Sequence, residues 1–130
     1  MKKEFIQVGE LRIKKGSIKK YRAIGHCEIS INFTSSVSVY ETETIKFDTI
    51  EIRDCEIKKL DLMFEHDFIV VEDLRIRLNT IKKYKPLNGV KAVLYYSTSR
   101  SKVVSDVFDF SSTMKREEFL LDLDVKFGIA

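Results

Sequence analysis

Alternation of apolar and polar residues is the feature of this sequence that most restricts its fold. Apolar side chains occur at every second position in residues 27–33, 45–47, 74–78 and 90–96, and less regularly in 104–110. A β-strand with one face in a hydrophobic core and the other in water has this period of two. About seven to nine such short segments predict a small antiparallel β-barrel or sandwich.

Two further segments complete the set of predicted strands. In residues 50–64 the alternating apolar residues are even-numbered, so the phase changes and the chain needs a bend or bulge before them. In residues 119–127 five large apolar side chains alternate, and we expect them to form one buried face of a closing strand. The sequence allows one short helix, over residues 112–118. The predicted fold class is therefore all-β with at most one short helix.

Length and composition indicate one folded domain. The chain has 130 residues, of which 44% are hydrophobic and 33% charged, and this suits a globular protein with a single core. No apolar run approaches the roughly 20 residues that cross a bilayer, so we expect no membrane insertion and a cytoplasmic location. No long internal repeat is expected, because the nearest pair of similar segments, 50–62 and 70–81, makes only two weak copies.

Residues that usually carry catalysis are scarce or poorly placed. His26 and Cys27 are neighbours on a predicted strand, so their side chains project to opposite faces. His66 has no second histidine at ligand spacing, and Cys27 and Cys55 are expected to stay reduced. Paired carboxylates at Asp122 and Asp124 fit a solvated strand face. The sequence therefore predicts no enzyme, no metal site and no cofactor.

Positive charge is concentrated near the start of the chain. The whole sequence has a formal net charge of +3, but residues 1–25 hold eight lysines and arginines against two glutamates. A solvated basic face explains such a segment, and so does an anionic partner. The candidate basic patch consists of Lys14, Lys15, Lys19 and Lys20.

The order of the predicted elements resembles that of the PilZ family of bacterial signalling domains. The resemblance runs from Lys19 to the end of the chain. It comprises a basic tail, a strand, a polar step containing an Asp, further strands around a segment rich in Val, Glu and Asp, and a closing x-Val-x-Phe signature. The matching segments are 19–22, 27–33, 49–53, 54–59, 60–64, 70–78, 90–96 and 123–127. The resemblance implies a PilZ-like β-barrel over residues 1–130, with a basic N-terminal segment 1–25.

PilZ domains bind cyclic di-GMP through an Arg-x-x-x-Arg tail and an (Asp/Asn)-x-Ser-x-x-Gly motif, and both are degraded here. Arg22 matches the first arginine, but His26 stands at the second. Asp54 matches the second motif, while Glu56 replaces its serine and Lys59 its glycine. Guanidinium groups grip phosphates, and glycine lets a ligand approach closely. The resemblance therefore implies weak or absent binding of cyclic di-GMP.

Three functions fit these observations. The first is a non-catalytic, PilZ-like regulatory domain that acts through protein–protein interaction. The second is a structural β-domain of a phage or secretion assembly, in which edge strands pair with neighbouring chains. The third is nucleic-acid binding through the basic N-terminal segment, together with the Lys82-Lys83-Tyr84-Lys85 turn.

Overall fold

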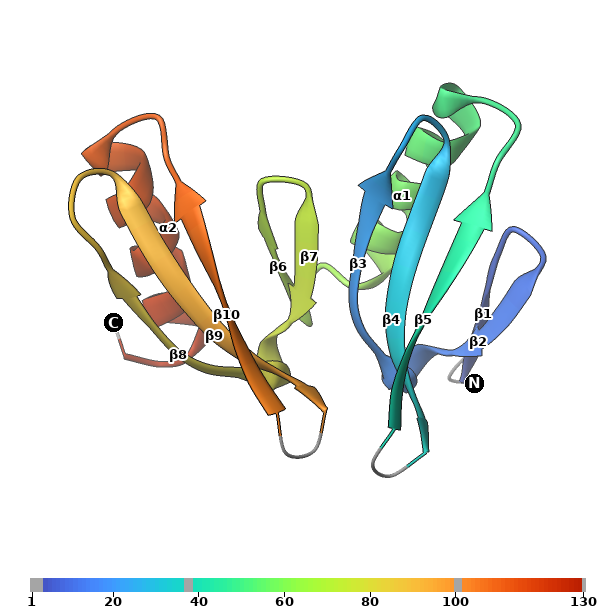
Figure 1. Ribbon diagram of the computed structural model, residues 1–130, viewed down its shortest axis with the longest axis horizontal. Helices are drawn as coiled ribbons and strands as arrows, with labels where there is room; N and C mark the ends of the chain where they lie inside the picture. Colours follow the sequence, from blue (N-terminus) through green and yellow to red (C-terminus); the bar gives the residue numbers. More distant parts are fainter. Residues whose placement is uncertain (1–3, 37–38, 100–101, 130) are drawn as a thin grey trace. The chain divides into compact units, whose positions relative to one another are not determined.

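The computed structural model describes residues 4–36, 39–99 and 102–129 and divides the chain into two compact units, Met1–Asn79 and Thr80–Ala130. Lys2 and Lys3 of the basic segment therefore lie outside the described residues. Figure 1 shows the order of the elements, which alternate between antiparallel strands and two helices.

The N-terminal unit contains two antiparallel sheets. Strands β1 (Phe5–Val8) and β2 (Leu11–Lys14) form a two-stranded hairpin. A short 3₁₀ turn follows, and then β3 (Ile18–Ile24), β4 (Glu28–Ser36) and β5 (Val39–Lys46) form a meander. A second hairpin, β6 (Phe68–Val71) and β7 (Leu74–Arg77), adds to the outer edge of β3, so the larger sheet has the order β5-β4-β3-β7-β6. Much of the predicted basic tail is thus sheet.

The described residues of the C-terminal unit repeat the meander without an added hairpin. Strands β8 (Ile81–Pro86), β9 (Lys91–Ser99) and β10 (Lys102–Asp109) form a three-stranded sheet of order β10-β9-β8. Strands predicted over 90–96 and 104–110 are confirmed, but residues 82–85, predicted as a turn, belong to β8. Among the described residues none of the three sheets closes on itself, so a mostly β architecture is shown while the predicted barrel is not.

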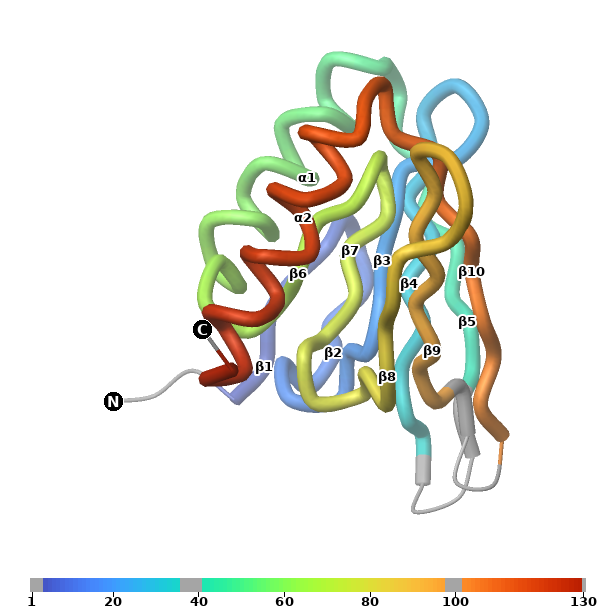
Figure 2. The backbone as a smooth tube through the Cα atoms, turned by 90° about the vertical axis from the view of Figure 1, so that its left-hand side faces the viewer, coloured from blue at the N-terminus to red at the C-terminus, as the bar shows by residue number. Residues whose placement is uncertain are grey.

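Helix α1 (Ile50–Met63) stands where residues 50–64 were predicted as strands, and that prediction is wrong. Thr49 caps the helix, because its hydroxyl oxygen accepts a hydrogen bond from the Ile52 amide at 3.1 Å. The buried side chains Ile57, Leu60 and Phe64 follow helical spacing of three and four. Even-numbered Ile50 and Leu62, which suggested alternation, are exposed. Helix α1 packs against β3 and β4, and Figure 2 shows the helix on one side of these strands.

Helix α2 (Thr113–Lys126) replaces the predicted closing strand and extends the short helix predicted over 112–118. Ser112 caps it by accepting a hydrogen bond from the Lys115 amide at 3.1 Å. Leu120 and Leu123 are buried, whereas Leu121 and Val125 are exposed. The five alternating apolar residues therefore do not share a face, because 3.6 residues per turn sends neighbours two apart to different sides.

A long internal repeat is present, and the prediction that there is none was wrong. Every element recurs 63 positions later: β1 with β6, β2 with β7, β3 with β8, β4 with β9, β5 with β10 and α1 with α2. Residues 5–21 and 68–84 are identical at 10 of 17 positions. Even the left-handed turn residue recurs, since Gly9 (φ 59°) corresponds to Glu72 (φ 56°). The chain is a tandem duplication of one ββ-βββ-α unit.

The hairpin β1–β2 packs its apolar face into the core of the N-terminal unit. Ile6, Val8 and Ile13 join a cluster of buried residues that includes Tyr21 and Phe64. At the hairpin turn a Cβ on Gly9 would lie 2.8 Å from the Ile45 side chain, so the close approach requires glycine here, while the positive φ of the turn is also adopted by Glu72. No helix in the described ranges is long and apolar enough to span a membrane.

Candidate functional site

One polar cluster of the N-terminal unit joins a tyrosine, a carboxylate and a guanidinium. The Tyr21 hydroxyl on β3 donates a hydrogen bond to Asp61 Oδ1 on α1 at 2.8 Å. Arg75 on β7 donates to the same carboxylate from Nε at 3.0 Å and from Nη2 at 3.1 Å. Burial, followed by the Asp61 hydrogen bond, raises the pKa of Tyr21, so its phenol stays protonated. The cluster ties the second hairpin to the helix and the sheet.

The duplication reproduces part of this cluster in the C-terminal unit. Tyr84 donates to Asp124 Oδ1 at 2.8 Å, as its counterpart Tyr21 does to Asp61. Burial and this hydrogen bond raise the pKa of Tyr84 to about 12. In the part of the chain that the structure describes, no guanidinium lies against the Asp124 carboxylate. Sequence reasoning missed both clusters, although the 63-residue repeat of Tyr and Asp was a signal for them.

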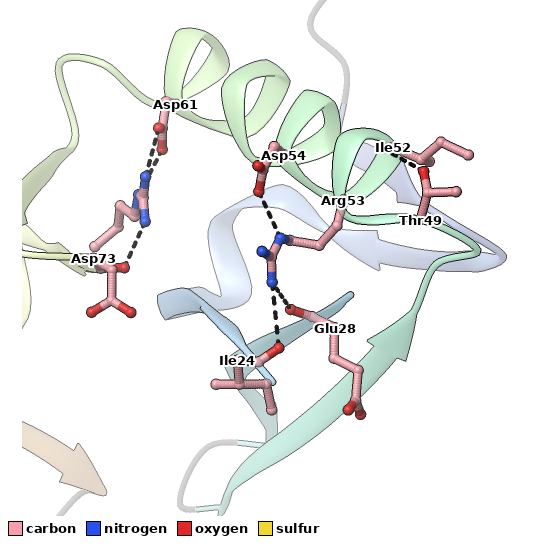
Figure 3. Close-up of polar contacts among 9 residues, drawn as sticks. Ile24, Glu28, Thr49, Ile52, Arg53, Asp54, Asp61 and Asp73 are labelled. Carbon is pink, nitrogen blue, oxygen red and sulfur yellow. Dashed lines mark hydrogen bonds and ion pairs between the residues drawn. The ribbon is translucent and has the colours of Figure 1, made fainter. Parts of the chain in front are cut away.

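A second duplicated feature is an arginine that holds the turn after the first meander strand. Arg53 Nη1 on α1 donates to the carbonyl oxygens of Ile24 at 3.4 Å and Glu28 at 3.3 Å, while Nε contacts Asp54 at 2.7 Å (Figure 3). Its counterpart Arg116 donates from Nη1 to the carbonyls of Leu87 at 2.9 Å and Gly89 at 2.8 Å. Both arginines stabilise the loop beside the helix N-terminus.

A cavity lined by cations lies at this loop in the C-terminal unit. It has a volume of about 680 Å³ and is lined by Lys85, Pro86, Leu87, Asn88, Lys91 and Arg116. Lys85 and Lys91 are exposed, and among the described lining residues there is no carboxylate. Arg116 is held by Leu87, Gly89 and an ion pair with Glu117 at 2.6 Å. The two lysines are therefore the groups available to an anion.

A smaller cavity of about 290 Å³ in the N-terminal unit has mixed charge. Lys14, Lys15 and Arg77 line it together with the carboxylates of Glu4 and Asp67, and Phe64 forms an apolar wall. Arg77 lies over the Phe68 ring, with 4.7 Å from its guanidinium carbon to the ring centroid. Because cations and carboxylates nearly balance, this cavity suits an anion less well than the C-terminal one.

The five residues predicted from the PilZ motifs lie on different elements. Arg22 on β3 forms an ion pair with Asp73 at 3.1 Å, and His26 lies exposed in the β3–β4 turn. Asp54, Glu56 and Lys59 lie on α1, where Lys59 contacts Glu56 at 3.3 Å. The resemblance requires two strands, 49–53 and 60–64, joined by a polar step over residues 54–59, but α1 (Ile50–Met63) occupies most of this stretch. Whether these residues bind a cyclic dinucleotide stays a prediction.

The predicted basic patch is distributed around β2 and β3. Lys14 is exposed, whereas Lys15, Lys19 and Lys20 are half-buried. Burial and the nearby Arg77 lower the pKa of Lys19, and Lys20 pairs through its backbone with Ile76 of β7. Only part of the patch is thus available at the surface.

Metal-ligating residues do not gather in the described part of this fold. Within residues 4–36, 39–99 and 102–129, no three His, Cys, Asp or Glu side chains could hold one ion. Cys27 is half-buried and Cys55 exposed, both as thiols, and His66 contacts its neighbour Glu65 at 3.2 Å.

Comparison with known proteins shows a likeness of fold. No family model and no curated protein matches the chain. A solved structure does match: the LytTr DNA-binding domain of a protein described as a methyl-accepting/DNA response regulator from Bacillus cereus. The TM-score is 0.58 at 12% sequence identity, over 92% of this chain and 98% of that one. The two share a fold across almost their whole lengths.

Proposed function

We propose that this protein is a non-catalytic DNA-binding domain that contacts the phosphate backbone through the C-terminal unit. The observation that carries the proposal is the cavity lined by Lys85, Lys91 and Arg116 with no carboxylate among its described lining residues. The likeness of fold to a LytTr DNA-binding domain supports it. So does the net charge of +3.

The two lysines suit contacts that position a protein on DNA. Each carries a compact positive charge on a long side chain, which reaches a phosphate without fixed geometry. Such contacts give affinity that depends strongly on salt and little on base sequence. Arg116 acts differently, because its hydrogen bonds to Leu87 and Gly89 hold the loop between Lys85 at the end of β8 and Lys91 at the start of β9.

Fluorescence anisotropy with a labelled DNA duplex tests the proposal. Non-specific association is expected with a dissociation constant of about 1–100 μM at physiological salt. The double variant Lys85→Gln/Lys91→Gln should bind at least about tenfold more weakly. Each phosphate contact that is lost lowers the number of counterions released from the DNA on binding.

The matched control is Lys58→Gln/Lys59→Gln, which removes the same charge from α1. Equal loss of affinity in both double variants would show that only net charge matters and would remove the proposed site. No association of the parent protein at about 0.1 mM would contradict the proposed function itself.

A further inference from the structure

Equivalent aromatic residues of the two repeats differ sharply in exposure. Phe64 is 1% exposed and Phe68 is 4% exposed, and their ring centroids lie 4.7 Å apart. The counterpart of Phe64, Phe127, is 39% exposed, and the counterpart of Phe68, Phe5, is 59% exposed. The sequence has phenylalanine at all four positions. Phe127 and Phe5 therefore have the side chains for the ring contact that Phe64 and Phe68 make.

The strand edges of the two repeats differ in pairing, as the aromatic residues differ in exposure. The outer edge of β3 is paired with β7 in the register Lys20↔Ile76, Tyr21↔Arg75 and Arg22↔Leu74. In the described residues, the equivalent edge of β8 pairs with no strand, and neither does the edge of β2, the counterpart of β7. An unpaired edge offers a row of amide and carbonyl groups to another strand.

Charges at these two edges are complementary in the same way as at the paired ones. In the N-terminal unit Arg75 contacts Asp61, and Asp73 contacts Arg22. The counterparts on the first hairpin are Arg12 for Arg75 and Glu10 for Asp73. Their partners in the C-terminal unit would be Asp124 and Lys85. The opposite signs are conserved at both pairs across the duplication.

The aromatic cluster of the C-terminal unit has two of the three rings that its N-terminal counterpart has. Tyr21 packs against Phe64 with ring centroids 6.0 Å apart, and against Phe68 at 5.3 Å. Tyr84 and Phe127 reproduce the first contact, also at 6.0 Å. The third ring of the C-terminal cluster would have to come from the counterpart of Phe68, which is Phe5 of the first hairpin.

We propose that the β1–β2 hairpin of one copy of this chain docks on β8 and α2 of a second copy, as β6–β7 docks on β3 and α1 within one chain. The register is Ile13↔Lys83, Arg12↔Tyr84 and Leu11↔Lys85, antiparallel. Arg12 forms an ion pair with the Asp124 carboxylate, and Glu10 forms one with Lys85. Phe5 packs on Phe127. The inference does not rest on the proposed DNA binding.

The contact joins two different surfaces, so it is heterologous. Each copy offers one hairpin and one open β8 edge, and association therefore continues from copy to copy into chains or closed rings. Pairing by added strands is a known mode of recognition in which backbone hydrogen bonds supply affinity and side chains supply register.

Sedimentation velocity tests the association with charge-reversal variants. The parent's average mass should rise between about 5 μM and 1 mM, as expected of a small interface. Arg12→Asp alone and Asp124→Arg alone should each stay monomeric, because like charges then face each other. Mixing the two variants restores opposite charges at every contact and should restore the parent's mass. A parent that stays monomeric, or a mixture that does not regain mass, overturns the proposal.

Disulfide trapping gives a second measurement that does not depend on the stability of the charge variants. Leu11 and Lys85 are paired in the proposed register, and directly paired residues have Cα atoms about 4.5–5.5 Å apart, which suits a disulfide. In a background with Cys27→Ser and Cys55→Ser, Leu11→Cys/Lys85→Cys should give a ladder of oligomers on oxidation. The control Leu11→Cys/Lys115→Cys should give none. Monomers only, or equal ladders from both, overturn the proposal.

Discussion

Removal of the Asp61 carboxylate should lower the stability of the protein more than the same change at its counterpart, Asp124. Replacing it with alanine leaves the Tyr21 hydroxyl and the Arg75 guanidinium without the oxygens they now contact at 2.8, 3.0 and 3.1 Å. The matched change, Asp124→Ala, removes one 2.8 Å hydrogen bond from the half-buried Tyr84. The two substitutions are chemically identical and occupy equivalent positions on α1 and α2.

The expected costs differ because the surroundings differ. Leaving the buried Tyr21 hydroxyl unsatisfied costs about 1–3 kcal/mol. Loss of the Arg75 contact adds about 1 kcal/mol, well below the figure for a fully buried pair, because the Asp61 side chain is 31% exposed. We therefore expect Asp61→Ala to lower the free energy of unfolding by about 2–4 kcal/mol. Asp124→Ala should cost about 0.5–1.5 kcal/mol, since water can replace the lost partner.

Urea unfolding followed by circular dichroism measures both variants against the parent at low protein concentration. The midpoint should fall clearly for Asp61→Ala and slightly for Asp124→Ala. Equal losses would refute the reasoning, because they would mean that the Arg75 contact and the deeper burial of Tyr21 contribute nothing to stability.

Three further predictions concern ligand, pH and helix packing. Calorimetry should detect no micromolar binding of cyclic di-GMP, and such binding would contradict the prediction of a degraded motif. The Tyr84 pKa of about 12 lies above the ordinary value near 10, so the folded state retains a proton that the unfolded chain loses. Stability should therefore fall from about pH 10 to about pH 12. Urea melts at these pH values should show a smaller fall for Tyr84→Phe, and an equal fall would contradict the assignment. Leu123→Ala should cost about 2–5 kcal/mol and Val125→Ala within about 0.5 kcal/mol; equal costs in urea melts would contradict the helix.

Strands β4, β7, β9 and β10 were predictable from alternation, but β1–β3 and β8 were not, and of the helices only residues 112–118 were expected. For α1 the reason is local. In residues 50–64, Ile50, Ile52, Leu60 and Leu62 alternate by chance, and three of these four are exposed in α1. The side chains that α1 buries, Ile57, Leu60 and Phe64, are spaced by three and four, which is helical spacing. Thr49 was an available N-cap signal, but a polar residue before an apolar one also occurs where a strand begins.

The candidate site depended on the duplication, which the sequence shows only in part. Identity is concentrated in residues 5–21 and 68–84, whereas α1 and α2 have diverged. The most similar pair of segments in the sequence analysis, 50–62 and 70–81, does not have the 63-residue spacing of the duplication. That pair therefore does not relate Tyr21 to Tyr84. Lys91, the first residue of β9, also gave no signal, because its place near Lys85 comes from the pairing of β8 with β9.

The salt dependence of DNA binding tests the central claim most directly. Anisotropy titrations from about 50 to 200 mM salt give the slope of log K against log [salt], which counts the phosphates that the protein neutralises. We predict that Lys85→Gln/Lys91→Gln makes this slope shallower by about 2, while Lys58→Gln/Lys59→Gln leaves it unchanged. A slope that is the same in the parent and the Lys85/Lys91 variant would contradict phosphate binding at the C-terminal cavity.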